Sequence, residues 1–307
     1  MSKAQIKNAL LLWFGLAAGS LLPGLAAADP GLPFLRLGSG ARSAALAEAV
    51  TALPGADAIS YNPAALQMRG RSTAFTHGEW IQDIRHEYLS FAFGKGQSAV
   101  GVALQVSQAH DLEFRTDPSA EPLGEFGVYE GALNLAYARR WNQNMHIGAN
   151  LKLIRQAIYT ETAAGVGLDL GLLYRVHPHL RLGLAARNLG RMNELDQEAT
   201  ALPRTVRLGL AYTGLPSLLL SLEAQHLAGG STTLHLGGEY AVHRHLSVRG
   251  GYQNADSRNL ALGLGTQTGV WSVNYAFIPF KSGLGEAHRL SVVWHHDANY
   301  SRKKSPQ

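Results

Sequence analysis

Residues 166–175 read Val166-Gly167-Leu168-Asp169-Leu170-Gly171-Leu172-Leu173-Tyr174-Arg175. Large apolar side chains occupy every second position, and the positions between them hold mostly glycine or charged residues. A β-strand sends successive side chains to opposite faces, so this stretch predicts a strand with one apolar face and one small or polar face. The same alternation recurs at 180–185, 206–212 and 289–294.

Fourteen segments of this kind follow one another from residue 73 onward. They lie at 73–80, 86–93, 98–108, 128–140, 145–157, 164–176, 178–188, 204–213, 217–227, 231–241, 244–252, 257–267, 268–277 and 286–295. Many are as long as the roughly 9–11 residues that a tilted strand needs to cross a bilayer.

The connections between these segments are sorted by length. Those after even-numbered segments are tight, and the long ones at 109–127, 188–203 and 278–286 all follow odd-numbered segments. Short turns at one end and longer loops at the other are typical of outer-membrane barrels. We therefore predict an all-β fold, an antiparallel up-and-down transmembrane β-barrel of about 14 strands.

The composition agrees with this prediction. The chain has 307 residues, of which 46% are hydrophobic and only 16% are charged, and its mean hydropathy is −0.05. Soluble proteins are usually about 25% charged, and helical membrane proteins need runs of roughly 20 apolar residues. The alternative interpretation of this pattern is a soluble exported β protein. The absence of cysteine excludes a disulfide scaffold, a thiolate metal site and a cysteine nucleophile.

The first residues have the pattern of an export signal. Lys3 and Lys7 precede an apolar stretch at 9–22, and Ala26-Ala27-Ala28 fits a small-residue cleavage site. We expect residues 1–28 to be a cleaved signal peptide; the alternative is a single anchoring helix. Without them the net charge falls from +5 to +3, and export also argues against a nucleic-acid partner.

Residues 29–70 do not alternate. The spacing of apolar residues predicts a helix over 41–53, and Asn62 before Pro63 predicts a turn. Gly40-Ala41-Arg42, then Asp57-Ala58, then Tyr61-Asn62-Pro63-Ala64, resembles the N-terminal region of PorV/PorQ-like outer-membrane proteins, which are relatives of the FadL-type transporters of hydrophobic compounds.

The resemblance implies that residues 29–70 fold inside the barrel as a hatch, followed by the barrel at 71–296 and a basic periplasmic tail at 297–307. The hatch motif residues that it implies are Arg42, Asp57, Tyr61, Asn62, Pro63 and Ala64. The family usually has glycines where this chain has Leu46-Ala47-Glu48, and these bulkier residues imply a tighter seal of the lumen.

Polar side chains on the inward faces of the predicted strands form a second candidate set. They are Asn134, Asn150, Lys152, Asp169, Arg175, Arg187, Arg207, Glu223, Glu239 and Arg249. Since buried charges need partners, we expect these groups to pair with one another and with the hatch. The alternative is a polar lining for solute passage.

Other candidate sites are weak. The histidine pairs at 177/179, 243/245 and 295/296 lack the converging ligands of a metal site, and we expect neither a metal nor a cofactor. No nucleophile elbow or zinc-protease motif is present, so an enzyme is not expected. We expect the acidic residues of the longest loop to be solvated; the alternative is that they contact the cations of lipopolysaccharide or an exported partner. These residues are Asp111, Glu113, Asp117, Glu121 and Glu125.

The function implied by the resemblance is that of a PorV/PorQ-type barrel in the outer membrane of a Gram-negative-type bacterium. Its role would be protein secretion or surface attachment, or movement of hydrophobic molecules across that membrane. The expected partners are outer-membrane lipid and lipopolysaccharide, with secretion-system components or a hydrophobic ligand. One alternative is a FadL-like or porin-like channel for small solutes, and a minor one is a barrel-embedded hydrolase.

Overall fold

The computed structural model describes residues 31–55, 57–66, 69–118, 121–195 and 198–296. Fourteen strands form one closed antiparallel barrel, in which β1 pairs with β16. The predicted fold class is therefore confirmed. The expected signal peptide at 1–28 and the expected tail at 297–307 lie outside the described residues.

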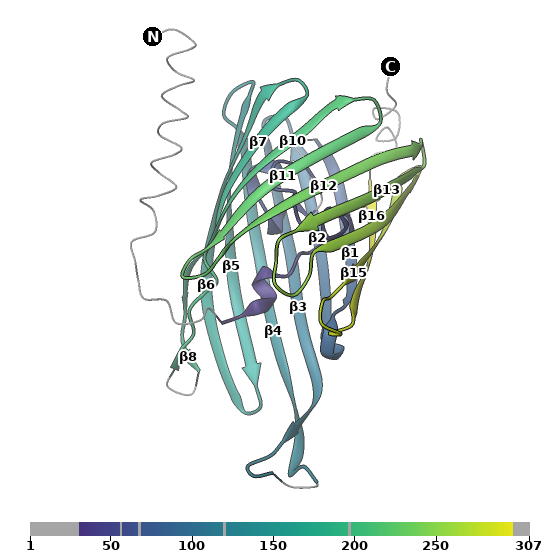
Figure 1. The fold of residues 1–307 in the computed structure, drawn as a ribbon. Helices are drawn as coiled ribbons and strands as arrows, with labels where there is room; N and C mark the ends of the chain where they lie inside the picture. Colours follow the sequence, from purple (N-terminus) through teal and green to yellow (C-terminus); the bar gives the residue numbers. More distant parts are fainter. Residues whose placement is uncertain (1–30, 56, 67–68, 119–120, 196–197, 297–307) are drawn as a thin grey trace.

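The barrel strands follow the chain in order around the wall (Figure 1). They are β1 (Gly70–Glu79), β2 (Arg85–Lys95), β3 (Ser98–Phe114), β4 (Gly124–Arg140), β5 (Met145–Ile158), β6 (Glu161–His177), β7 (Leu180–Met192), β10 (Thr205–Leu215), β11 (Leu218–Leu227), β12 (Thr232–His243), β13 (Leu246–Gln253), β14 (Leu260–Thr268), β15 (Trp271–Pro279) and β16 (Glu286–His295). β8 (Glu194–Leu195) and β9 (Glu198–Ala199) form a separate small sheet between β7 and β10.

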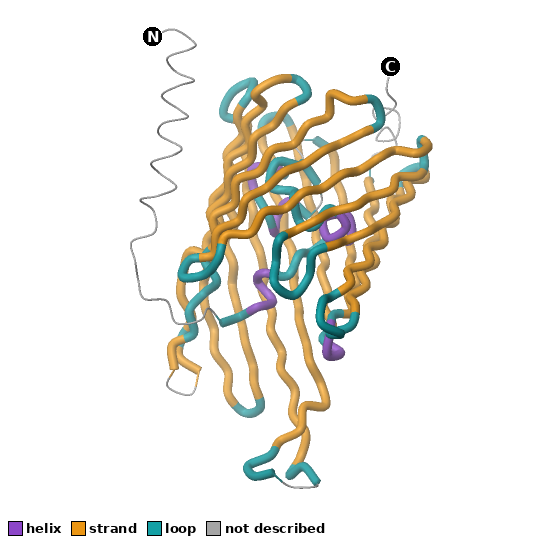
Figure 2. The backbone as a smooth tube through the Cα atoms, in the orientation of Figure 1, coloured by secondary structure: helices purple, strands orange, loops and turns teal. Residues whose placement is uncertain are grey.

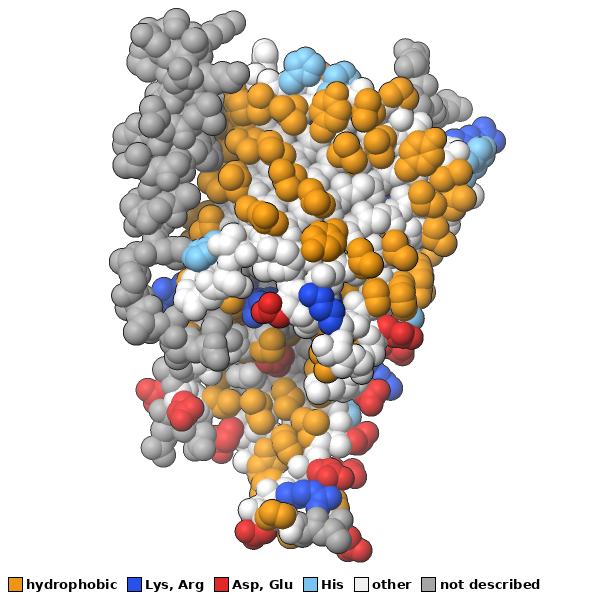
Figure 3. Space-filling model, in the orientation of Figure 1, with side chains coloured by type: hydrophobic (Ala, Val, Ile, Leu, Met, Phe, Trp, Pro, Cys, Tyr) orange, Lys and Arg blue, Asp and Glu red, His pale blue; other side chains and the backbone are white. Residues whose placement is uncertain are grey.

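The outer surface of the wall is apolar because the alternating side chains sort by face. Leu168 and Leu170 of β6 are exposed, whereas Asp169 between them is fully buried in the lumen. Figure 3 shows hydrophobic side chains spread over the strands and acidic side chains gathered at the long-loop end. Apolar area of this extent is unsuited to water and matches the lipid-facing surface of a membrane barrel.

The two ends of the barrel differ. One end, which we call the short-turn mouth, carries the tight turns, such as those between β6 and β7 and between β12 and β13. At the other end β3 and β4 project beyond the remaining wall, while β13 to β16 are short (Figure 1). No helix among the described residues is long and apolar enough to cross a membrane.

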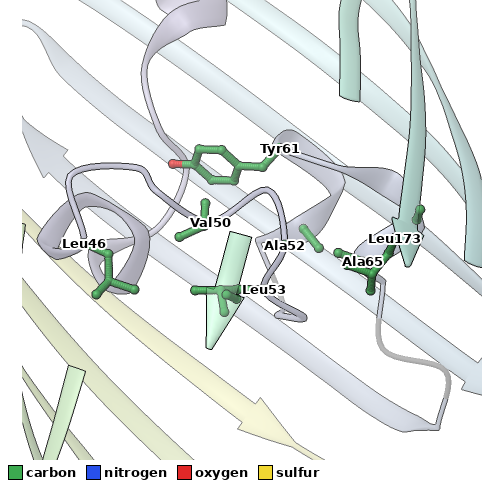
Figure 4. Packing of buried hydrophobic residues seen from close by; sticks show 10 residues of the cluster. Leu46, Val50, Ala52, Leu53, Tyr61, Ala65 and Leu173 are labelled. Atoms are coloured by element: carbon green, nitrogen blue, oxygen red, sulfur yellow. The ribbon is translucent and has the colours of Figure 1, made fainter. Parts of the chain in front are cut away.

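Residues 31–55 and 57–66, which we call the hatch, lie inside the barrel (Figures 1 and 2). The hatch contains η1 (Pro33–Arg36), α2 (Ala41–Ala45), η2 (Ala58–Ser60) and η3 (Pro63–Ala65), and a further short helix η4 (Ile81–Asp83) joins β1 to β2. Leu46, Val50, Leu53 and Tyr61 belong to one buried cluster that also includes Ala65 and, from the wall, Leu173, and these last two lie beside each other (Figure 4). The hatch therefore supplies most of the hydrophobic core that a lumen lined by small and polar residues lacks.

The helix predicted over 41–53 is wrong beyond Ala45. Ala47 and Glu48 adopt positive φ angles of 49° and 65°, a conformation that ends a right-handed helix. The chain then turns along the inner wall, where Thr51 contacts β10 and β11. Apolar spacing predicts a helix but cannot reveal this change of direction, because it is set by contacts with the wall.

Candidate functional site

The hatch rests on inward-facing glycines of the wall. A Cβ atom at Gly171 would lie 2.1 Å from Asn62 Oδ1, one at Gly183 would lie 2.3 Å from the Thr51 carbonyl oxygen, and one at Gly251 would lie 2.4 Å from the Ala47 nitrogen. Glycine is therefore needed for this close approach of wall and hatch. Comparable contacts occur at Gly101, Gly148, Gly237 and Gly263. The glycines that alternate with apolar residues in the sequence thus create the space in which the hatch fits.

Asn62 connects three segments. Its Oδ1 accepts a hydrogen bond from Ala64 N at 3.1 Å and so caps η3, with Pro63 at the first position of that helix. Its Nδ2 donates to the carbonyl oxygens of Thr51 at 2.8 Å and Leu172 at 3.1 Å. Because Leu172 belongs to β6, this fully buried side chain fixes the hatch both to itself and to the wall.

A second attachment joins α2 to the opposite part of the wall. Arg42 Nε and NH2 donate to both carboxylate oxygens of Glu239, at 2.7 and 3.2 Å. Arg249, which stands directly across from Glu239 in the β12–β13 register, donates from Nε at 2.6 Å. Glu239 therefore bridges one arginine of the hatch and one of the wall.

The third attachment is the most deeply buried. Arg207 of β10 pairs with Glu223 of β11, and Arg207 NH2 also donates to the Glu48 carbonyl oxygen at 2.7 Å. Glu223 accepts a hydrogen bond from Thr51 N at 2.9 Å. The Arg207 guanidinium lies 5.0 Å from the ring centre of Tyr61, within cation–π distance. Charged side chains of the wall thus form hydrogen bonds directly with backbone atoms of the hatch.

A polar cluster on β4 to β7 completes the lumen. Lys152 forms a 2.8 Å ion pair with Asp169, and Asn150 donates to both Asp169 and Asn134 at 3.0 Å. Arg187 NH2 donates to the Leu35 carbonyl oxygen at 3.2 Å and so contacts η1. These groups pair with one another and with the hatch rather than lining an open path.

Two of the predicted residues have different surroundings. Arg175 lies on the inward face of β6 but beyond the hatch, at the short-turn mouth, and is exposed. Its exposure follows from its place two residues from the end of β6. Asp57 is half-buried and lies against Gly40, where a Cβ atom would be 2.7 Å from Asp57 Oδ2.

Sequence analysis missed a buried cluster on the other side of the hatch. Glu48 lies 3.5 Å from Arg258, and Arg289 donates to the Gly38 carbonyl oxygen at 2.5 Å. Burial alone would raise the pKa of Glu48, but Arg258, Arg289 and Arg207 hold that pKa below its ordinary value. Both Arg258 and Arg289 also lie over the ring of Trp80. The one sequence feature that points to this cluster is Glu48, a single acidic residue in an alanine-rich stretch.

Two cavities open at the short-turn mouth. The larger, of about 950 Å³, reaches Arg42 and Asp57 of the hatch and Glu239 and Arg249 of the wall. The smaller, of about 440 Å³, lies beside β4 to β7. Open space thus extends from this mouth to the hatch.

The histidine pairs do not converge with other ligands. His177 and His179 lie in the exposed β6–β7 turn with ring centres 5.7 Å apart, and His243 and His245 occupy the β12–β13 turn in the same way. Among the residues that the structure describes, no group of three or more His, Cys, Asp or Glu side chains could hold a metal ion.

No family model matches the chain, and no curated protein matches it. Among solved structures, the toluene transporter TbuX of Ralstonia pickettii is similar with a TM-score of 0.63 at 15% identity, covering 84% of this chain and 99% of that one.

Two further structures share the fold. The monoaromatic hydrocarbon channel CymD has a TM-score of 0.64 at 14% identity, with 84% of this chain and 98% of that chain covered. A FadL homologue of Pseudomonas aeruginosa has a TM-score of 0.61 at 12% identity, with the same coverage of 84% and 98%. At such identities the likeness concerns the fold, and it extends over nearly the whole of each of these chains.

Proposed function

We propose that this protein is an outer-membrane channel for small hydrophobic molecules, and that the hatch is its gate. The carrying observation is a closed fourteen-strand barrel whose lumen holds its own N-terminal segment, packed against the wall. Three structures with the same fold are a toluene transporter, a monoaromatic hydrocarbon channel and a FadL homologue. The apolar outer wall supports a membrane location.

The arrangement of the ends supports an orientation. Outer-membrane barrels place short turns in the periplasm and longer loops outside the cell. We therefore place the short-turn mouth in the periplasm and the β3–β4 projection on the cell surface, where its acidic residues would meet lipopolysaccharide and its cations. Export would depend on the signal peptide predicted at 1–28.

The alternatives have less support. An open porin-like pore has less support, because several of the predicted lumen residues pair with one another or hold the hatch. The secretion or attachment role implied by the PorV/PorQ resemblance has no counterpart among the structural neighbours reported above. Their printed descriptions are of transporters and channels, which also favours a role without catalysis.

Uptake by whole cells tests the proposal. In a Gram-negative host without its own hydrocarbon channels, expression of the chain should raise the initial uptake rate of labelled toluene but not that of a labelled sugar. Asn62→Ala should admit the sugar as well, because removal of the Asn62 amide frees η3 from Thr51 and β6.

Two results would count against the proposal. One is unchanged toluene uptake while heat-modifiable gel migration shows a folded barrel in the outer membrane. The other is sugar uptake by the unmodified chain that equals its toluene uptake, which would favour the porin-like alternative.

A further inference from the structure

A basic cluster occupies the short-turn mouth, apart from the attachments of the hatch. Arg140, His146, Arg175 and Arg181 lie on four consecutive strands, β4 to β7, and each lies on the inward face of its strand. Together with Pro54, Ala65 and Leu66 of the hatch, they line the cavity of about 440 Å³. The cavity opens toward solvent at this end, so a small molecule can reach it without passing the hatch.

The positions of these side chains are electrostatically unfavourable. Arg175 stands directly opposite Arg181 in the β6–β7 register. Like charges directly across a sheet destabilise it. No residue lining this cavity is acidic, and among the described residues no ion pair joins a carboxylate to any of the three arginines.

Two other arginines of the lumen differ from these three in having carboxylate partners. Arg207 has Glu223, and Arg249 has Glu239. The wall therefore supplies a carboxylate to each of these two arginines, and supplies none to the three at the mouth. An excess of positive charge in a concave site attracts anions and raises their local concentration.

One arginine of the cluster is held in place by neutral groups. Arg175 NH2 donates to the Gln143 carbonyl oxygen at 2.6 Å and to Asn144 Oδ1 at 3.2 Å. The turn that carries these acceptors is itself fixed, because Asn142 Oδ1 accepts hydrogen bonds from the nitrogens of Asn144 and Met145 at 2.9 Å. The guanidinium is thus oriented without being neutralised.

We propose that Arg140, Arg175 and Arg181 form a binding site for a phosphate-class dianion at the short-turn mouth. Planar guanidinium groups donate paired hydrogen bonds to tetrahedral oxyanions, and three of them match a doubly charged group better than a carboxylate. Inorganic phosphate and the phosphomonoester headgroup of a lipid both present this chemistry. The site does not depend on what the channel transports.

Calorimetric titration of the folded protein in neutral detergent with inorganic phosphate tests the site. The unmodified chain should bind, and Arg140→Gln and Arg181→Gln should each weaken binding about tenfold, as expected for the loss of one charge-assisted hydrogen bond. Arg139→Gln is the matched control, since it removes the same charge one residue along β4 from an exposed side chain on the outward face. It should bind phosphate as the unmodified chain does.

Thermal unfolding separates binding from a structural role. Phosphate should raise the unfolding temperature of the unmodified chain but not that of Arg140→Gln/Arg181→Gln. In phosphate-free buffer this double variant should be at least as stable as the unmodified chain, because the repulsion between Arg181 and Arg175 has been removed. Dihexanoyl phosphatidate that binds more than tenfold tighter than phosphate would assign the site to a lipid headgroup; equal affinity would assign it to the free anion.

Three outcomes would overturn the proposal. They are absence of phosphate binding to the unmodified chain, an equal loss in Arg139→Gln, and a double variant that unfolds at a lower temperature than the unmodified chain in phosphate-free buffer.

Discussion

At the scale of single residues, inward-facing polar side chains hold the hatch through partners that the sequence only half reveals. Strand alternation alone places Asn150, Lys152 and Asp169 on one face. It does not say that Lys152, which stands opposite Gly167, reaches diagonally to Asp169. Nor does it reveal that Glu223 accepts a hydrogen bond from Thr51 N, because that contact depends on the path of the hatch.

Glu223 provides the residue-scale prediction. Glu223→Gln leaves the buried Arg207 without its counter-ion, and removal of one partner from a buried pair costs about 3–5 kcal/mol. Urea titration of the folded barrel in detergent, followed by tryptophan fluorescence, measures this loss. Glu161→Gln, at an exposed position that begins β6, should change stability by less than about 0.5 kcal/mol. Equal stability of the two variants would show that the buried pair does not hold the fold.

At the scale of elements, fourteen strands could be predicted because their periodicity is a property of each segment alone. The predictions failed where the backbone departs from regular geometry. β3 extends to Phe114 rather than 108, since a register shift between Ala109 and Leu112, with Asp111 at a φ of 58°, interrupts the alternation. The expected helix over 41–53 ends at Ala45 for a related reason, a change of backbone direction that tertiary contacts impose.

The glycine contacts of the hatch give the element-scale prediction. Gly250 and Gly251 are neighbours on β13, but an added Cβ at Gly251 would lie 2.4 Å from Ala47 N, whereas at Gly250 the nearest atom is 3.9 Å away. Gly251→Ala should therefore displace the hatch and raise single-channel conductance several-fold in planar bilayers. Gly250→Ala should leave conductance unchanged. If both variants conduct like the unmodified chain, the hatch does not depend on close contact with the wall.

At the scale of the whole molecule, the sorting of turns and loops, the low content of charge and the abundance of glycine have one origin. Most outward-facing wall residues are apolar, and most inward-facing ones are small or polar. These properties could be predicted because they repeat along the chain. The path of the hatch could be inferred only by resemblance, since it is one irregular segment whose contacts come from nearly every strand.

Membrane embedding predicts a depth-dependent cost of charge. Leu168→Arg, in the middle of β6 and on its outward face, should destabilise the barrel in lipid by about 2–4 kcal/mol. Leu123→Arg, in the β3–β4 loop with 66% of its surface exposed, should have little effect. Urea unfolding in phosphatidylcholine vesicles compares the two, and a harmless Leu168→Arg would contradict a lipid-facing wall.

The central claim, that the hatch is a gate, is tested most directly by locking it. The chain has no cysteine, and a Cβ atom at Gly209 would lie 3.2 Å from Thr51 Cβ, close to the roughly 3.5–4.5 Å that disulfides require. In Thr51→Cys/Gly209→Cys, oxidation should abolish toluene uptake and reduction should restore it, while either single variant should be insensitive to the oxidant. If the fully cross-linked protein takes up toluene as fast as the protein with the disulfide reduced, the account is contradicted.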